Sequence, residues 1–235
     1  MRTLTALFLS TTLAAPAFAV DASGQAQPIA FDLTFMTHVD AGVAEQDVYI
    51  ERAPGAREVY RPGPSFTDVN QRLFASAKPQ SHNPVDPAAV GPFPKGAELD
   101  VTLDEWLGAR GDGHYHVEDG EGHLTIAFEG LVPNGVYTLW HFFMVNGETD
   151  PFIGTFDLPA GAFDGSQSIF VADAEGTATF DQTFETPLQL SGEQLGAGLA
   201  VNWHSDGKSY GVLPGEFGRN AHIQLFASLP GRPDL

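Results

Sequence analysis

The sequence predicts an all-β protein: an antiparallel, Greek-key-like β-sandwich with short helical turns and long loops. Two observations lead to this expectation. Short runs that are apolar or alternate between apolar and polar residues recur through the second half of the chain. Turn signals such as Pro133-Asn134-Gly135 and Glu175-Gly176 separate these runs. Many short strands joined by frequent turns are typical of an antiparallel sandwich or barrel.

The first 19 residues have the features of a secretory signal peptide. Arg2 supplies a positive charge, residues 4–15 form a short apolar run, and Ala17-Phe18-Ala19 has the small-residue pattern of a cleavage site. The apolar run is shorter than the about 20 residues that a membrane-spanning helix needs. The sequence therefore predicts an exported protein, periplasmic or extracellular, without a membrane span.

The composition limits the chemistry and the partners of the chain. Asp and Glu number 30 against 11 Lys and Arg, the formal net charge is −19, and there are 0 Cys. The charge disfavours nucleic acid as a partner. The lack of cysteine excludes disulfides, thiolate metal sites and a cysteine nucleophile. A hydrated acidic surface explains the charge most simply, and carboxylate binding of divalent cations is the alternative.

Residues 20–77 are expected to form an N-terminal β-rich segment. Residues 29–37 alternate like a strand, and residues 48–50 and 58–60 flank a Pro54-Gly55 turn like the arms of a hairpin. The pattern of residues 65–77 is ambiguous but fits one face of a helix, with Ser65 as cap and Asp68 as the acid three residues later.

Residues 78–96 are expected to be a linker or a long crossover, because they contain five prolines. Residues 97–235 are then the expected sandwich domain. At its start Thr102 and Glu105 have the spacing of a capping box, which predicts a short helix or turn over 103–109. Strands are expected at 115–117, 124–129, 136–145, 152–156, 168–172, 177–184, 199–203 and 221–228. The expected core contains Trp140, Phe142, Ile126, Phe128, Val201, Ile223 and Leu225.

One candidate metal site lies on a predicted hairpin around residues 119–122. Alternation along its strands places four potential ligands on the face opposite the core: His114, His116, Glu118 and His123. The register expected for the hairpin sets Glu118 opposite His123 and His116 opposite Thr125. Imidazoles and a carboxylate on one face suit Zn or Cu. The alternative is a plain solvated face.

A second candidate site contains His141 and His204, each preceded by Trp on an apolar strand, with His222 as a possible third ligand. Such histidines are expected to be buried and to need hydrogen-bond partners. They form either a shared metal site or two separate core histidines. The neighbouring His204-Ser205-Asp206 is not expected to be a catalytic triad, because adjacent residues in a turn cannot form that relay.

Several landmarks resemble those of Cu/Zn superoxide dismutases and the related chordin-type sandwiches. They are residues 130–137, His141, residues 172–178, residues 199–206 and residues 218–221. The resemblance implies a Greek-key sandwich with His141 and His204 in the places of copper ligands, and it offers Arg219 as a guiding arginine. The family's paired histidines are here Leu139-Trp140-His141, no His lies between His141 and His204, and the cysteine bridge is missing. Full dismutase activity is therefore not expected.

Together these patterns predict a secreted acidic β-sandwich that binds a metal ion, such as Cu or Zn, or a small extracellular ligand. The alternative is a redox or hydrolytic enzyme with a histidine-based metal site, degenerate relative to superoxide dismutase. The binding role is favoured over an enzyme because no H-E-x-x-H motif occurs and the adjacent residues His204, Ser205 and Asp206 cannot form a catalytic relay.

Overall fold

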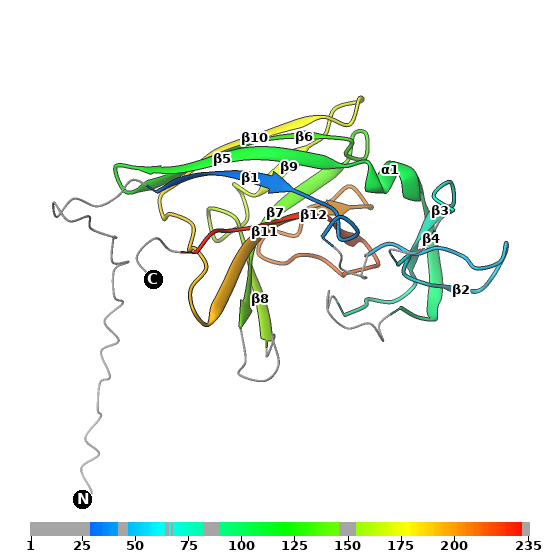
Figure 1. The fold of residues 1–235 in the computed structure, drawn as a ribbon. Helices are drawn as coiled ribbons and strands as arrows, with labels where there is room; N and C mark the ends of the chain where they lie inside the picture. The colour runs from blue at the N-terminus through cyan, green and yellow to red at the C-terminus, as the bar shows by residue number, and fades with distance from the viewer. Residues whose placement is uncertain are drawn as a thin grey trace, which may run out of the picture.

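The computed structural model describes residues 29–41, 47–63, 66, 68–81, 90–145 and 154–231. Its fold is an antiparallel β-sandwich, which confirms the predicted fold class. Figure 1 shows two sheets packed as layers, with a small third sheet and the single described helix at one end. The expected signal peptide, residues 1–19, lies outside the described residues, as does part of the expected linker, residues 82–89.

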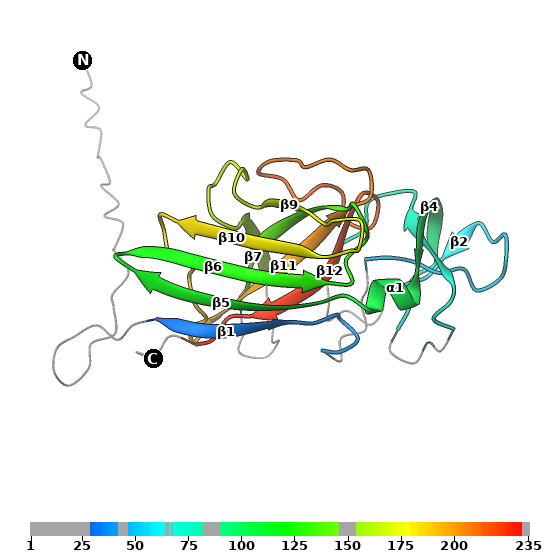
Figure 2. The same cartoon turned by 90° about the horizontal axis from the view of Figure 1, so that it is seen from above.

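The first sheet has the strand order β1-β5-β6-β10, and Figure 2 shows its strands side by side. Its strands are β1 (Ala30–Phe35), β5 (Arg110–Glu118), β6 (Glu121–Glu129) and β10 (Ala178–Phe184). The second sheet has the order β12-β11-β7-β8, with β9 also paired to β7. Its strands are β7 (Val136–Val145), β8 (Gly154–Pro159), β9 (Ile169–Val171), β11 (Leu195–His204) and β12 (Ala221–Ser228). The chain therefore crosses repeatedly between the sheets, as in a Greek key.

The core lies between the two sheets and is formed by alternate residues of each strand. From the predicted core, Ile126 and Phe128 of the first sheet and Val201 and Leu225 of the second belong to this cluster. Phe170 stacks on Phe128, with ring centroids 5.1 Å apart. Burial of these large apolar side chains is the main stabilising contribution to the fold.

The other three predicted core residues, Trp140, Phe142 and Ile223, pack on the outer face of the second sheet, in a separate cluster. The sequence prediction that these three side chains face the main core is therefore wrong. The apolar pattern could not choose the face, because nearly every side chain of β7 is apolar and Leu139 and Phe143 alternate with Trp140 and Phe142. Sheet pairing decides which set faces the partner sheet.

The N-terminal segment contributes a strand to the sandwich. β1 pairs with β5 from Ala30 opposite His116 to Phe35 opposite Gly111. Just after β1, Met36 pairs with Phe226 of the second sheet. The expected hairpin is also present in part, since the backbone N–H groups of Ile50 and Tyr60 donate to each other's carbonyl oxygens at 2.8 and 2.9 Å.

The third sheet, of order β2-β4-β3, includes residues that the sequence predicted as a helix and as the end of a linker. Its strands are β2 (Glu58–Val59), β3 (Arg72–Ser76) and β4 (Phe93–Thr102). The helix considered for 65–77 was wrong, because four of the five residues of β3 are buried and both faces of that strand are covered. The linker was expected to extend to residue 96, whereas β4 begins at Phe93. The strand accommodates Pro94 because its register with β3 is irregular.

The predicted capping box is confirmed at helix α1 (Leu103–Leu107). The Glu105 N–H donates to Thr102 Oγ1 at 3.3 Å, and the Thr102 N–H donates to the Glu105 carboxylate at 2.8 Å. Trp106 of this helix is fully buried and lies 6.0 Å from the Trp203 ring. The helix thus closes one end of the core. Among the described residues, no helix has the length and apolar character needed to cross a bilayer.

Candidate functional site

The β5–β6 hairpin carries the first candidate site in a register different from the predicted one. His116 lies opposite His123, His114 opposite Thr125, and Glu118 opposite Glu121. The turn contains only Asp119 and Gly120, both with positive φ, 51° and 87°. Positive φ at both central residues characterises the tight type I′ hairpin turn. The resulting shift of two residues keeps every side chain on its predicted face.

Three of the four predicted ligands come together on this face. The ligand atoms of His116, Glu118 and His123 all lie within 4.8 Å of one another. Both imidazoles are half-buried and the carboxylate is exposed. Two imidazoles and one carboxylate are a ligand set that Zn²⁺ and Cu²⁺ accept, with a position left open to solvent.

The fourth predicted ligand, His114, lies beside the group but has another partner. Its Nδ1 is 2.9 Å from the Asp32 carboxylate of β1, and its ring lies 5.7 Å from the His116 ring. The pairing of β1 with β5 places Asp32 directly opposite His114. The sequence pattern of the hairpin alone could not predict this contact, because Asp32 belongs to the distant strand β1.

The neighbouring strand β10 orients one of the imidazoles. Thr183 lies opposite His123, and its hydroxyl oxygen is 3.1 Å from His123 Nδ1. Nε2 is therefore the nitrogen left for a metal ion. A hydrogen bond to the second ring nitrogen is the usual way in which proteins orient a metal-binding histidine.

The charges around the group favour a cation. Glu118 and Glu121 are exposed and lie directly opposite each other at the end of the hairpin. Like charges in directly opposite positions destabilise an antiparallel pair. A bound divalent cation would relieve this repulsion, so binding and hairpin stability should be coupled.

The second candidate group does not assemble, because His141 and His204 lie on opposite faces of the second sheet. His141 shares the inner face with Phe143, its ring 4.2 Å away, and its Nε2 is 3.0 Å from the Gln189 carbonyl oxygen. His204 Nε2 on the outer face is 2.8 Å from Thr138 Oγ1. Burial lowers the pKa of each ring to about 4.

His222 is fully buried and has a partner at each ring nitrogen. Its Nδ1 is 2.7 Å from the Asp47 backbone carbonyl oxygen, and its Nε2 is 3.0 Å from Ser205 Oγ. Burial lowers the pKa of this ring as well. Neither nitrogen can bind a metal ion without losing a hydrogen bond. The sequence expectation of a shared His141, His204 and His222 site is therefore not met by this geometry.

The contact between Ser205 and His222 is the one that sequence reasoning missed. The sequence relates Ser205 only to its chain neighbours His204 and Asp206. The structure instead brings it to an imidazole on the adjacent strand β12, where Trp203 and His222 are register partners. The antiparallel pairing of β11 with β12 is the information that identifies this contact.

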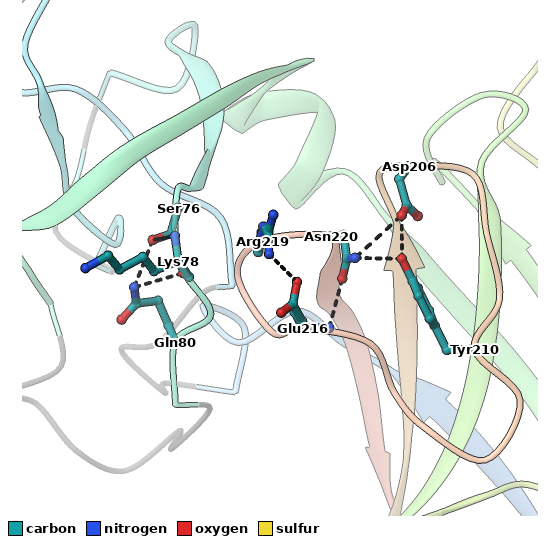
Figure 3. A network of polar contacts seen from close by, with 8 residues as sticks. All are labelled: Ser76, Lys78, Gln80, Asp206, Tyr210, Glu216, Arg219 and Asn220. Atoms are coloured by element: carbon teal, nitrogen blue, oxygen red, sulfur yellow. Dashed lines mark hydrogen bonds and ion pairs between the residues drawn. The ribbon is translucent and has the colours of Figure 1, made fainter.

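A polar network holds the loop that follows Ser205 (Figure 3). The Tyr210 hydroxyl donates to the Asp206 carboxylate, and Asn220 Nδ2 donates to Tyr210 Oη at 2.6 Å. The Asn220 side-chain oxygen accepts the Glu216 N–H at 2.8 Å. The hydrogen bond to Asp206 raises the pKa of Tyr210. These contacts fix the loop between β11 and β12 next to the Ser205–His222 pair.

No family model, curated protein or solved structure matches this chain. The resemblance to Cu/Zn superoxide dismutases and chordin-type sandwiches therefore remains an expectation from sequence landmarks.

Proposed function

We propose that the protein is an exported β-sandwich module that binds a divalent metal ion, Zn²⁺ or Cu²⁺, through His116, Glu118 and His123. The observation that carries this proposal is the approach of three ligand atoms to within 4.8 Å of one another on one sheet face. Two of these ligands, His116 and His123, occupy directly opposite positions on neighbouring strands. The two rings lie face to face, with planes 12° from parallel, so the rings must turn for a nitrogen of each to point at one ion.

The wider chemistry of the chain agrees with a cation as ligand. The net charge of −19 attracts cations and repels nucleic acid. Export, which the first 19 residues support, would place the site outside the cytoplasm. The lack of cysteine leaves imidazole and carboxylate as the ligands for Zn or Cu.

Catalysis of the superoxide dismutase type is disfavoured. His141 and His204 belong to opposite faces of one sheet, so they cannot hold one copper ion between them. The acidic chain would also repel superoxide, which is an anion. We expect no appreciable superoxide dismutation, even with copper supplied.

Calorimetric titration of the mature protein with ZnCl₂ or CuSO₄ tests the proposal. We expect one ion per chain, with His116→Ala and His123→Ala each weakening binding by more than about tenfold. His114→Ala is the matched control, because this exposed histidine on the same strand lies outside the three-residue group. Its affinity should stay within about twofold of wild type. Unchanged affinity in the His116→Ala/His123→Ala double variant would overturn the proposal.

Thr183→Val provides a second, less disruptive test of the same site. Loss of the hydroxyl next to His123 Nδ1 should weaken metal binding by about tenfold, the typical effect of removing a hydrogen bond that orients a ligand. Thr125→Val is the control, because the Thr125 hydroxyl donates to Asp181 at 3.2 Å instead. Equal affinities of the two variants would show that Thr183 does not orient a ligand.

A further inference from the structure

We propose that Ser205 is an activated nucleophile, with His222 as its general base, that can accept an acyl or phosphonyl group from a small neutral or cationic ester. The proposal is independent of the metal site. It combines the hydrogen bonds of His222, the burial of the two residues and the charges around them.

The partners of His222 determine which of its nitrogens carries the proton. A backbone carbonyl oxygen can only accept a hydrogen bond, so the 2.7 Å contact with Asp47 requires the proton on Nδ1. In the neutral ring Nε2 is then unprotonated and accepts the Ser205 hydroxyl at 3.0 Å. This is the arrangement of an activated serine: the base faces the nucleophile and a third group orients the base.

Burial supports the same roles. His222 is fully buried, and burial lowers the pKa of its ring, so the ring is neutral near neutral pH with Nε2 unprotonated. Ser205 is half-buried, at the end of β11 where the polar loop begins. The base is therefore shielded from water, while Ser205 as a residue lies at the boundary with solvent.

The backbone around Ser205 is held in place. Its own N–H donates to the Asn220 carbonyl oxygen at 3.1 Å. The next residue, Asp206, is engaged by the Tyr210 hydroxyl and by the Lys208 N–H at 3.3 Å (Figure 3 shows the Tyr210 contact). A fixed hydroxyl next to its base meets the geometric requirement for nucleophilic attack.

The reaction is a transfer to the serine oxygen. Ser205 Oγ forms a bond to the carbonyl carbon of an ester, and its proton moves to His222 Nε2. The bond from that carbon to the alkoxy oxygen then breaks, and the leaving alcohol takes the proton from Nε2. Water can later hydrolyse the acyl-serine by the same route. The loop itself is balanced, with Asp206 and Glu216 against Lys208 and Arg219, but the net charge of the chain is −19, so a neutral or cationic ester is favoured over an anionic one.

Labelling of the wild-type protein with a small neutral fluorophosphonate, followed by peptide mass mapping, tests the proposal. Attack by Ser205 Oγ would release fluoride and leave a stable phosphonyl-serine. The chain has an internal control in Ser166, which is more exposed and is held through its backbone N–H by Asp164, without an imidazole. We expect Ser205 to react about 100-fold faster than Ser166, the low end of general-base assistance.

The faster labelling of Ser205 relative to Ser166 should disappear in urea, where the contact between the two strands is lost. His222→Gln should abolish the same difference in the folded protein. If His222→Gln fails to fold, the labelling rates of Ser205 and Ser166 in the wild-type chain still test the proposal. No label on Ser205, or equal labelling of both serines in the folded protein, would overturn the proposal and leave the Ser205–His222 contact as a purely structural hydrogen bond.

Discussion

The imidazole rings of His116 and His123 lie face to face across the β5–β6 hairpin, with centroids 4.7 Å apart and planes 12° from parallel. Their position depends on the two-residue turn at Asp119 and Gly120, because any longer turn would move the two rings apart along their strands. The candidate metal site is therefore a consequence of hairpin register, and changes that disturb the hairpin should disturb the site.

A methyl group at Gly122 should destabilise this hairpin. A Cβ there would lie 2.5 Å from Tyr115 Oη, whose hydroxyl oxygen accepts the Leu188 N–H at 2.8 Å. We expect Gly122→Ala to lower the free energy of unfolding by about 1–3 kcal/mol, the range for overpacking a core. Urea denaturation measures it. In a Tyr115→Phe background the penalty should shrink, since the clashing oxygen is gone, and equal penalties in both backgrounds would contradict this reading.

Trp140→Ala should be strongly destabilising even though this residue lies outside the main core. The side chain is 3% exposed, packs in the outer cluster, and donates its Nε1–H to Thr138 Oγ1 at 2.8 Å. We expect a loss of about 3–5 kcal/mol in the free energy of unfolding. Phe163→Ala is the control, because that ring is 71% exposed and should change stability by less than about 0.5 kcal/mol. Equal effects would show that the outer cluster contributes little.

Stability should fall as the pH decreases from about 6.5 toward 4. Burial lowers the pKa of His141 from 6.5 to about 4, so in this window the unfolded chain binds a proton that the folded protein does not. Protonation therefore favours unfolding, by up to about 1.4 kcal/mol per pH unit for one such group, and above pH 6.5 the effect is absent.

His141→Gln tests the source of this slope. A glutamine amide can still donate to the Gln189 carbonyl oxygen but does not titrate, so the fall in stability between pH 6.5 and 4 should be shallower than in wild type. His204, with its pKa also lowered to about 4, should account for part of the remaining slope. Chemical denaturation at several pH values measures it, and an unchanged slope would mean that His141 does not carry the effect.

Exported protein should begin at or near Val20. Ala17 and Ala19 provide the small residues that signal peptidase requires before the cleaved bond. Intact mass measurement of protein from the periplasm or culture fluid checks this. Material that keeps Met1 would contradict both the cleavage site and the proposed export.

Local sequence patterns predicted the structure correctly wherever a structural feature depends on only a few neighbouring residues. Alternation and turn residues located the strands of the sandwich, and the spacing of Thr102 and Glu105 located the only helix among the described residues. The period of two along a strand also placed His116, Glu118 and His123 on one face, although the expected register was two residues away from the observed one.

Tertiary structure decided what depends on pairing between distant segments. The apolar strand β7 could bury either face, and only its pairing with β11 and packing against the first sheet put Leu139 inward and Trp140 outward. The same pairing separates His141 from His204, and the neighbouring β11–β12 pair brings Ser205 to His222. A strand has two faces and several possible registers of similar local energy, so its environment is chosen by the strands beside it.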